Sequence, residues 1–149
     1  MSWQLKTFAE LTVDELYAIL QVRFQVFVLE QQCLYAELDG KDQTAYHLFK
    51  MQDGKVAAYL RIYRTAAGQA ALGRVLVKKQ FRGQGIAQEL IARAISFVEK
   101  GLNAGQIKIQ AQEYLRNFYG AWGFVPVSTV YLEDGIPHVD MLRSHLPLK

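Results

Sequence analysis

The stretch QFRGQGIAQEL, Gln80 to Leu90, sets two glycines between an apolar segment, Ala71 to Val77, and a segment with helical periodicity. Gly83 and Gly85 therefore stand at a strand-to-helix junction. Backbone N–H groups at a helix start lack internal partners and the helix dipole adds partial positive charge there, so this junction suits an anion. Glycines also let an anion approach the backbone closely. The stretch predicts either a phosphate-binding turn or a plain tight connection.

Two common nucleotide-binding motifs do not fit this turn. The chain contains no GxxxxGK[ST] sequence, and Gln88 stands where a GxGxxG motif requires its third glycine. No acidic residue follows at a clear strand end, where a dinucleotide-binding fold needs one. These departures argue against a nucleoside triphosphate and against a nicotinamide dinucleotide.

Composition limits the class of protein. The chain has 149 residues, 51% of them hydrophobic, which is enough for one domain, residues 1–149, with its own core. Its 17 Lys and Arg against 14 Asp and Glu are scattered singly, which disfavours nucleic acid as a partner. No apolar stretch approaches the roughly 20 residues of a membrane span, and the N-terminus lacks a signal pattern. With one cysteine, Cys33, we expect a cytoplasmic protein without disulfides or a multi-cysteine metal site.

Periodicity and turn signals divide the chain into helices and strands. A capping-box pair, Thr12 and Glu15, opens a first helix that we expect to run to about Val28. The elements expected after it are an acidic loop (Glu30 to Asp42), strands at Tyr46 to Met51, Lys55 to Tyr63 and Ala71 to Val77, a helix from Gly85 to Lys100, a strand from Gln106 to Ala111, a short helix from Glu113 to Ala121, and strands at Phe124 to Leu132 and His138 to Arg143. The central strand-helix-strand unit predicts one parallel crossover inside an otherwise antiparallel, mixed α+β sheet.

The glycine turn carries a family resemblance. RGQGIA, Arg82 to Ala87, matches the R/Q-x-x-G-x-G/A signature of the GNAT superfamily of acyl-CoA-dependent N-acetyltransferases, with Arg82, Gly85 and Ala87 at the defining positions. The strand before this turn and the long helix after it also resemble that family. The combined match is far more specific than the two glycines alone.

Three further segments extend the resemblance over essentially the whole chain. NFYGAWGF, Asn117 to Phe124, is similar to the second landmark of GNAT proteins, and Arg23 to Asp42 and Glu133 to Met141 resemble the ElaA-like branch. The order of the expected elements is also the GNAT order. The resemblance implies the GNAT fold, a twisted and mostly antiparallel α/β sheet with a central parallel unit and helices on both faces.

The resemblance implies acetyl-CoA as co-substrate and no metal. Backbone amides of the glycine turn would hold the pyrophosphate of coenzyme A. The main chain of the preceding strand would pair with the pantetheine arm, in a gap where this strand and Gln106 to Ala111 splay apart. The residues assigned to the coenzyme A site are Val75, Leu76, Val77, Arg82, Gly83, Gln84, Gly85, Ile86, Ala87 and Asn117.

Acyl transfer to an amine needs an oxyanion donor, an acid for the departing thiolate, and a neutral amine. A backbone N–H at Leu76 or Val77 would stabilise the oxyanion. Tyr119 matches the tyrosine that acts as general acid in many GNAT enzymes, although its spacing alone favours core packing with its aromatic neighbours. Glu30 and His138 are the candidate bases, each with an ordinary alternative as a solvated or structural side chain.

Other chemistry-bearing residues have open roles. His47 is a weaker candidate base, and Cys33 is taken as an ordinary thiol. Arg23 and Arg74 either line the acceptor pocket or form buried ion pairs. The acidic loop, Glu30 to Asp42, would attract a cationic acceptor or simply be solvated.

We therefore expect an N-acetyltransferase, acting as a monomer or homodimer, that joins acetyl-CoA and a small-molecule or peptide amine in a ternary complex. The alternative is a non-catalytic acyl-CoA binding or sensing module that keeps the cofactor turn but lacks an acceptor site. A third interpretation is a structural α/β domain with no cofactor.

Overall fold

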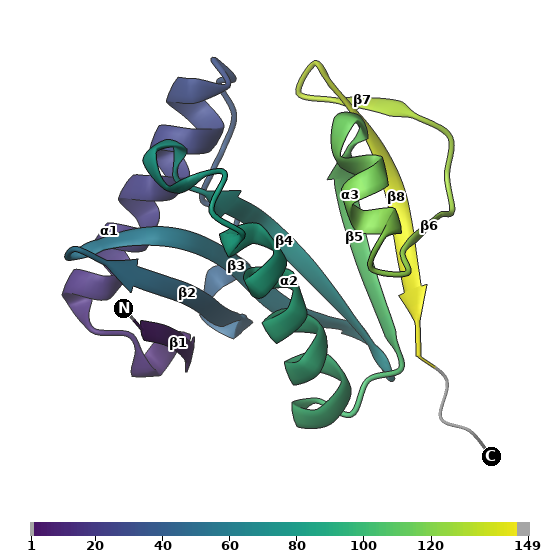
Figure 1. Ribbon diagram of the computed structural model, residues 1–149, viewed down its shortest axis with the longest axis horizontal. Coiled ribbons are helices and arrows are strands. Elements are labelled where there is room, and N and C mark those ends of the chain that lie inside the picture. Colours follow the sequence, from purple (N-terminus) through teal and green to yellow (C-terminus); the bar gives the residue numbers. More distant parts are fainter. Residues whose placement is uncertain (1, 146–149) are drawn as a thin grey trace.

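The computed structural model describes residues 2–145, which form a mixed sheet covered by helices on both faces (Figure 1). The strands are β1 (Ser2–Thr7), β2 (Tyr46–Gln52), β3 (Lys55–Ala66), β4 (Gln69–Val77), β5 (Gln106–Gln112), β6 (Val125–Pro126), β7 (Tyr131–Glu133) and β8 (Ile136–Ser144). Their order across the sheet is β1-β2-β3-β4-β5-β8-β6, with β7 also paired to β8. Only β4 and β5 pair in parallel among the described strands, which confirms the predicted fold class.

The helices lie on the two faces of this sheet. They are α1 (Val13–Arg23), continued by the π-helical η2 (Phe24–Glu30), then α2 (Ile86–Ser96), continued by η5 (Phe97–Gly101), and α3 (Arg116–Gly120), preceded by the short η6 (Glu113–Leu115); η1 (Phe8–Glu10), η3 (Asp42–Thr44) and η4 (Lys79–Phe81) are single turns. No helix within residues 2–145 is both long enough and apolar enough to cross a bilayer.

Two apolar clusters hold the layers together. The larger one packs α2 and α3 against one face of the sheet, and it includes the fully buried Leu90 and Ile91. The smaller one packs α1 and η2 against the opposite face, where Ile19 and Val22 meet Tyr59 of β3. Because β3 is buried on both faces, its sequence is an almost continuous run of apolar residues.

The predicted start of the first helix is confirmed. The Thr12 hydroxyl accepts a hydrogen bond from the Glu15 amide at 3.0 Å, and the Glu15 carboxylate accepts one from the Thr12 amide at 2.9 Å. This capping box satisfies two backbone donors that the helix leaves unpaired. The helix then runs through η2 to Glu30 and so carries that residue to the sheet edge near the glycine turn.

Two parts of the predicted topology are wrong. The N-terminal residues 2–7 form an edge strand, β1, which pairs antiparallel with β2. The single strand expected from Phe124 to Leu132 is instead two short strands, β6 and β7. Between them the amide of Asp140 in β8 donates to the Ser128 hydroxyl at 2.9 Å, so a side chain replaces the main-chain partner and the ladder is interrupted.

Leu90 provides a test of the larger cluster. Its side chain is fully buried between α2 and the sheet, so Leu90→Ala should lower the free energy of unfolding by about 2–5 kcal/mol through lost transfer energy and a residual cavity. Gln88→Ala changes an exposed position on the same helix and should cost about 0.5 kcal/mol or less. Urea denaturation measures both, and equal losses would contradict this packing.

Candidate active site

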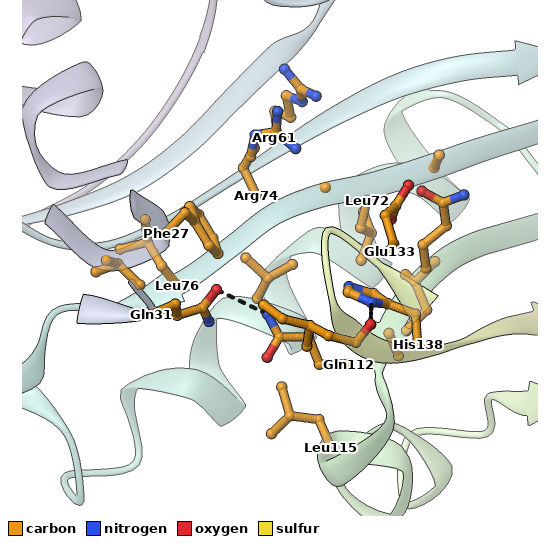
Figure 2. Close-up of a pocket in the computed structure, with 18 of the residues that line it drawn as sticks. Phe27, Gln31, Arg61, Leu72, Arg74, Leu76, Gln112, Leu115, Glu133 and His138 are labelled. Atoms are coloured by element: carbon orange, nitrogen blue, oxygen red, sulfur yellow. Dashed lines mark hydrogen bonds between the residues drawn. The ribbon is translucent and has the colours of Figure 1, made fainter. Parts of the chain in front are cut away.

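The strands β4 and β5 separate about halfway along their length. Their parallel pairing runs from Gln69 with Gln106 to Leu72 with Ile109 and then stops, although both strands continue. A cleft of about 900 Å³ opens at this break and is bordered by η2, the loop after it, β4, β5, α3 and the β7–β8 hairpin (Figure 2). One edge of β4 therefore faces a cavity instead of a neighbouring strand.

A bulge in β4 lies where the strands separate. Between Gly73 and Leu76 the strand has one residue more than the opposing segment of β3. Arg74, inside the bulge, has a φ of +53°, in the left-handed region that non-glycine residues rarely adopt. Bulges redirect side chains and end regular pairing, and this one turns Arg74 toward the cleft wall.

The glycine turn has the geometry of an anion-binding site. Gly83 and Gly85 both have a φ of +79°, and a Cβ at either would project into open space. Within residues 2–145, no hydrogen-bond acceptor is found for the backbone N–H groups of Gly85, Ile86 and Ala87, which open α2. These donors face a position that favours negative charge.

A second hollow, of about 390 Å³, lies over this turn. It is lined by Phe81, Gly83, Gly85, Ile86 and Gln88, and by the residues that it shares with the cleft: Val77, Arg82, Ala87 and Phe118. The two cavities therefore adjoin. Of the predicted cofactor residues, Gln84 and the exposed Asn117 line neither cavity.

Two predicted site residues form an ion pair with each other. The Arg82 guanidinium donates to both carboxylate oxygens of Glu30, at 2.6 and 3.0 Å, and its Nε donates to the Val77 carbonyl at 2.8 Å. The pair links the end of η2 to the end of β4 and to the glycine turn. Both side chains border the cleft, so the Glu30 carboxylate lies beside the turn already engaged by a cation.

Tyr119 lies in the cleft wall on α3. Its ring packs edge-on against Phe118 and Phe124, and the residue is 4% exposed. Burial, with a smaller contribution from Tyr114, raises the pKa of the Tyr119 hydroxyl above its ordinary value. No hydrogen bond of this hydroxyl is found in the described part of the chain, and its oxygen is not among the fully buried polar atoms that lack a partner, so it is accessible from the cleft. The side chain is thus both a core residue and a protonated donor that borders the cleft.

His138 reaches the cleft from β8. Its Nδ1 lies 2.7 Å from the Ile136 carbonyl, which can only accept, so Nδ1 carries the proton and Nε2 of the neutral ring is an acceptor. The Tyr131 ring stacks on the His138 ring, with 6.1 Å between the two ring centroids. The arrangement suits a base whose tautomer is fixed by the backbone.

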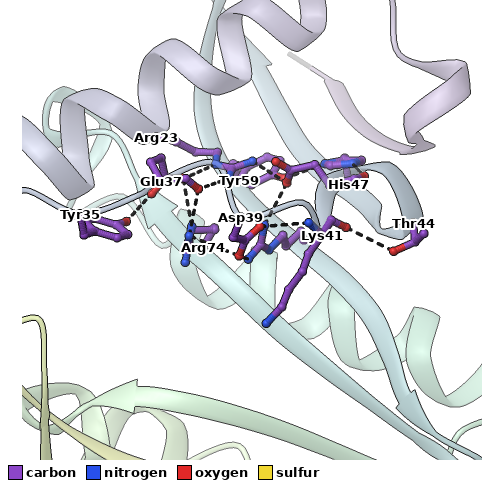
Figure 3. A network of polar contacts seen from close by, with 11 residues as sticks. Arg23, Tyr35, Glu37, Asp39, Lys41, Thr44, His47, Tyr59 and Arg74 are labelled. Atoms are coloured by element: carbon purple, nitrogen blue, oxygen red, sulfur yellow. Dashed lines mark hydrogen bonds and ion pairs between the residues drawn. The ribbon is translucent and has the colours of Figure 1, made fainter.

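Three carboxylates of the acidic loop pair with arginines. Arg23, which is fully buried, donates to the carboxylates of Glu37 at 2.6 Å and Asp42 at 2.7 Å (Figure 3). Arg61 of β3 contacts Asp42 at 3.0 Å and also pairs with Asp39. Arg74 is the third arginine that pairs with these carboxylates. Together the three arginines and three carboxylates form one network beneath the cleft.

The remaining candidates have structural surroundings. His47 is buried, with Nδ1 at 2.6 Å from the Tyr59 hydroxyl and Nε2 at 2.9 Å from the Asp42 carbonyl, and burial lowers its pKa. Cys33 borders the cleft, but its thiol donates to the Asp134 carbonyl at 3.4 Å. Arg61 was not among the residues singled out from sequence; its signal was that it is the one charge within the apolar segment 56–63 of β3.

Comparison with known proteins agrees with this architecture. Residues 9–144 match the family model of the acetyltransferase (GNAT) domain, and the chain belongs to the GNAT family. Within that family it is homologous to ElaA of Escherichia coli K12, with 37% identity over 148 residues that cover 97% of each chain.

Solved structures extend the match to three dimensions. The crystal structure of Escherichia coli ElaA superposes with a TM-score of 0.91 at 37% identity, covering 97% of this chain and 100% of the other. An acyl-CoA N-acyltransferase from Pseudomonas aeruginosa superposes with a TM-score of 0.91 at 43% identity, covering 96% and 99%. The protein is therefore an acyltransferase of the GNAT family that uses an acyl-CoA.

The buried network gives a stability prediction. Asp42→Asn removes the charge that Arg23 and Arg61 share, so we expect a loss of about 3 kcal/mol at pH 7, because buried cations are left uncompensated. Asp53→Asn, at the exposed β2–β3 turn, should cost about 0.5 kcal/mol or less. Urea denaturation distinguishes them, and similar losses would contradict the network.

The same variant has a pH signature. Burial alone would raise the pKa of Asp42, but hydrogen bonds and charges from Arg23 and Arg61 outweigh it and hold that pKa below its ordinary value. The unfolded chain then takes up protons before the folded one, so wild-type stability should fall as the pH drops below about 4. Asp42→Asn should show a smaller fall, and an unchanged pH dependence would be the contrary result.

Proposed function

We propose that the protein is an N-acetyltransferase that transfers the acetyl group of acetyl-CoA to a primary amine, by direct attack within a ternary complex. The observation that carries this proposal is the continuity of the two cavities. The hollow over the glycine turn adjoins the cleft at Val77, Arg82, Ala87 and Phe118, and Tyr119 lies in the cleft wall. A donor with a phosphate end and an amide-containing arm fits this combination of sites.

The donor would bind mainly through the backbone. The N–H groups of the turn, Arg82 to Ala87, would hold the pyrophosphate, with Gln84 contributing only its main chain. The edge of Val75, Leu76 and Val77 that faces the cleft would pair with the pantetheine amides, as an added strand pairs with a sheet edge. Asn117, whose side chain lines neither cavity, is left out of the proposed contacts.

The proposed reaction is a single acyl transfer. The amine nitrogen attacks the thioester carbon, and the carbonyl oxygen becomes an oxyanion that accepts a hydrogen bond from the N–H of Val77, because the register with β3 turns the Leu76 N–H toward Tyr59. The C–S bond then breaks and the thiolate takes the hydroxyl proton of Tyr119. Burial keeps this phenol protonated before the reaction, and the amide product leaves with coenzyme A in its thiol form.

We assign the base function to His138. Its Nε2 is an acceptor in the tautomer that Ile136 imposes, so it can take the amine proton directly or through a water. Glu30 is held by two hydrogen bonds to Arg82, and this supports a role in fixing the cofactor turn rather than in removing a proton. A cytoplasmic location belongs to the same proposal, because Cys33 is an unpaired thiol.

The function is tested by thiol release from acetyl-CoA across a panel of small amines and peptides. Turnover of at least one amine supports the proposal, and parallel assays with longer acyl-CoAs test the acetyl preference. Binding of acetyl-CoA without turnover of any amine would indicate an acyl-CoA sensor instead.

Tyr119→Phe tests the general acid. Removing the hydroxyl should lower kcat by about a hundredfold or more, while the Kd for acetyl-CoA stays within about threefold of wild type. Tyr17→Phe makes the same chemical change at an exposed position of α1 that does not line the cleft, and it should leave both constants unchanged. An unaltered kcat in Tyr119→Phe across the pH range would remove this residue from the mechanism.

Gly85→Ala tests the cofactor turn. An alanine at a φ of +79° strains the backbone of the turn, and we expect the Kd for acetyl-CoA to rise about tenfold. Gly54→Ala imposes similar strain at a φ of +72° in the β2–β3 turn, where a Cβ also meets no atom within 4 Å. Calorimetric titration should show weaker binding only for Gly85→Ala; wild-type affinity in that variant would count against the assignment.

A further inference from the structure

The cleft wall contains an arginine whose guanidinium is held rigidly but is only partly used. Arg74 donates from Nε to the Glu37 carboxylate at 2.9 Å and from Nη2 to the Glu37 carbonyl at 3.0 Å, with Asp39 at 3.5 Å (Figure 3). The Tyr35 ring lies against it, 5.4 Å from ring centre to guanidinium carbon. No acceptor for Nη1 is found within residues 2–145.

This unused nitrogen belongs to a side chain that borders the cleft. The Arg74 side chain is 20% exposed, and its guanidinium is absent from the buried groups that lack a partner, so Nη1 is accessible. The other two arginines of the network differ. Arg23 is fully buried, and Arg61 is 2% exposed with both Nη atoms bound to carboxylates.

The backbone supports the same assignment. Arg74 adopts a left-handed φ in the bulge at the start of the splay between β4 and β5. That conformation costs free energy for a non-glycine residue, so it persists only where surrounding contacts hold it. Here Glu37 and Tyr35 hold the side chain, so the fork is oriented toward the cleft before any ligand arrives.

Charged side chains of both signs border the cleft, among them Asp39 beside Arg74 and Lys108 on β5. Lys41, whose ammonium lies 5.3 Å from the centroid of the Tyr63 ring, also borders the cleft, and no ion pair of Lys41 is found within residues 2–145. Across the cavity the β7–β8 hairpin contributes Glu133 and His138 (Figure 2). The Arg74 side of the cleft therefore offers an N–H donor to an anion through Nη1, and the hairpin side offers acceptors for an amine.

We propose that the acceptor is a primary amine that also carries a carboxylate, and that Arg74 binds this carboxylate through Nη1. The inference rests on the proposed acyl transfer in this cleft and narrows its acceptor to amino-acid-like molecules. Arginine suits the role because its planar guanidinium stays charged and presents fixed donors.

Matched amine pairs test the proposal. L-leucine with isoamylamine, L-phenylalanine with phenethylamine, β-alanine with ethylamine and γ-aminobutyrate with propylamine differ within each pair only by the carboxylate. We expect kcat/KM to favour the carboxylated member by about tenfold or more in at least one pair, because one charge-assisted hydrogen bond is gained. The preferred pair also reports the spacing between amine and carboxylate.

Variants assign the preference to Arg74. In Arg74→Gln the ratio within the preferred pair should fall to near one, whereas Lys41→Gln, which removes one charge from the same wall, should leave it within about twofold of wild type. Should Arg74→Gln fail to fold, Arg74→Lys keeps the charge without the fork and should lower the ratio by about threefold or more. An undiminished ratio in the folded Arg74 variant, or an equal loss in Lys41→Gln, overturns the assignment.

Calorimetric titration of the same compounds into the coenzyme A complex separates this inference from the proposed function. If carboxylated members bind to the wild type and not to the Arg74 variant, the carboxylate site is supported even when no amine is acetylated. The lack of acetylation would then count only against the proposed acyl transfer. Turnover of plain amines with no carboxylate preference and no carboxylate binding overturns the site and leaves acyl transfer standing. Neither binding nor turnover of any carboxylated amine also overturns the site.

Discussion

The parallel pairing between β4 and β5 ends after Leu72 and Ile109, and the rest of the site depends on this break. Strands normally satisfy their backbone groups through neighbours on both sides, so a central strand that loses one neighbour exposes a row of donors and acceptors. The sheet tolerates the break because one core cluster spans it, with Leu90 of α2, Ile109 of β5 and Tyr119 of α3 packed together. An unpaired strand edge thereby becomes the wall of a cavity.

The buried network beneath the cleft contributes more to the position of the loop after η2 and of Arg74 than to the net stability of the fold. Removing charges from water is costly, and their mutual attraction only offsets that cost when every group is paired. Here Arg23 and Asp42 lie on different elements, and together with Glu37 they tie the loop after η2 to the sheet. The loop would otherwise have few apolar contacts of its own, since Leu34 and Leu38 are exposed. The network therefore fixes the acceptor side of the cleft and the orientation of Arg74.

Much of this architecture could be predicted from sequence, because its strongest signals are local. The glycine turn, the amphipathic α2 and the capping box at Thr12 depend on neighbouring residues alone. The strand β1 was missed because a short edge strand, half exposed, has little periodicity to detect. The break between β6 and β7 depends on Ser128 contacting a distant strand, which no local pattern encodes.

The same distinction between local signals and contacts with distant elements applies to the functional residues. Arg82 and Tyr119 follow from motifs, whereas the partner of each charged residue depends on elements distant in the chain. The pairing of Glu30 with Arg82 joins positions 52 residues apart. The solvated interpretation was wrong for the carboxylates of Glu37 and Asp42, which are buried and on which arginines of three separate elements converge. Sequence indicates which side chains are present; tertiary structure decides which of them remain available to a ligand.

Hydrogen–deuterium exchange with and without saturating acetyl-CoA tests the central claim most directly, because the proposed donor contacts are backbone amides. We expect slower exchange at two places, the turn from Gly83 to Ala87 and the cleft edge of β4 from Val75 to Val77, where N–H groups without a protein acceptor would gain one. Unchanged exchange at both segments, with protection elsewhere in the chain, would contradict the assignment of this cleft as the acyl-CoA site.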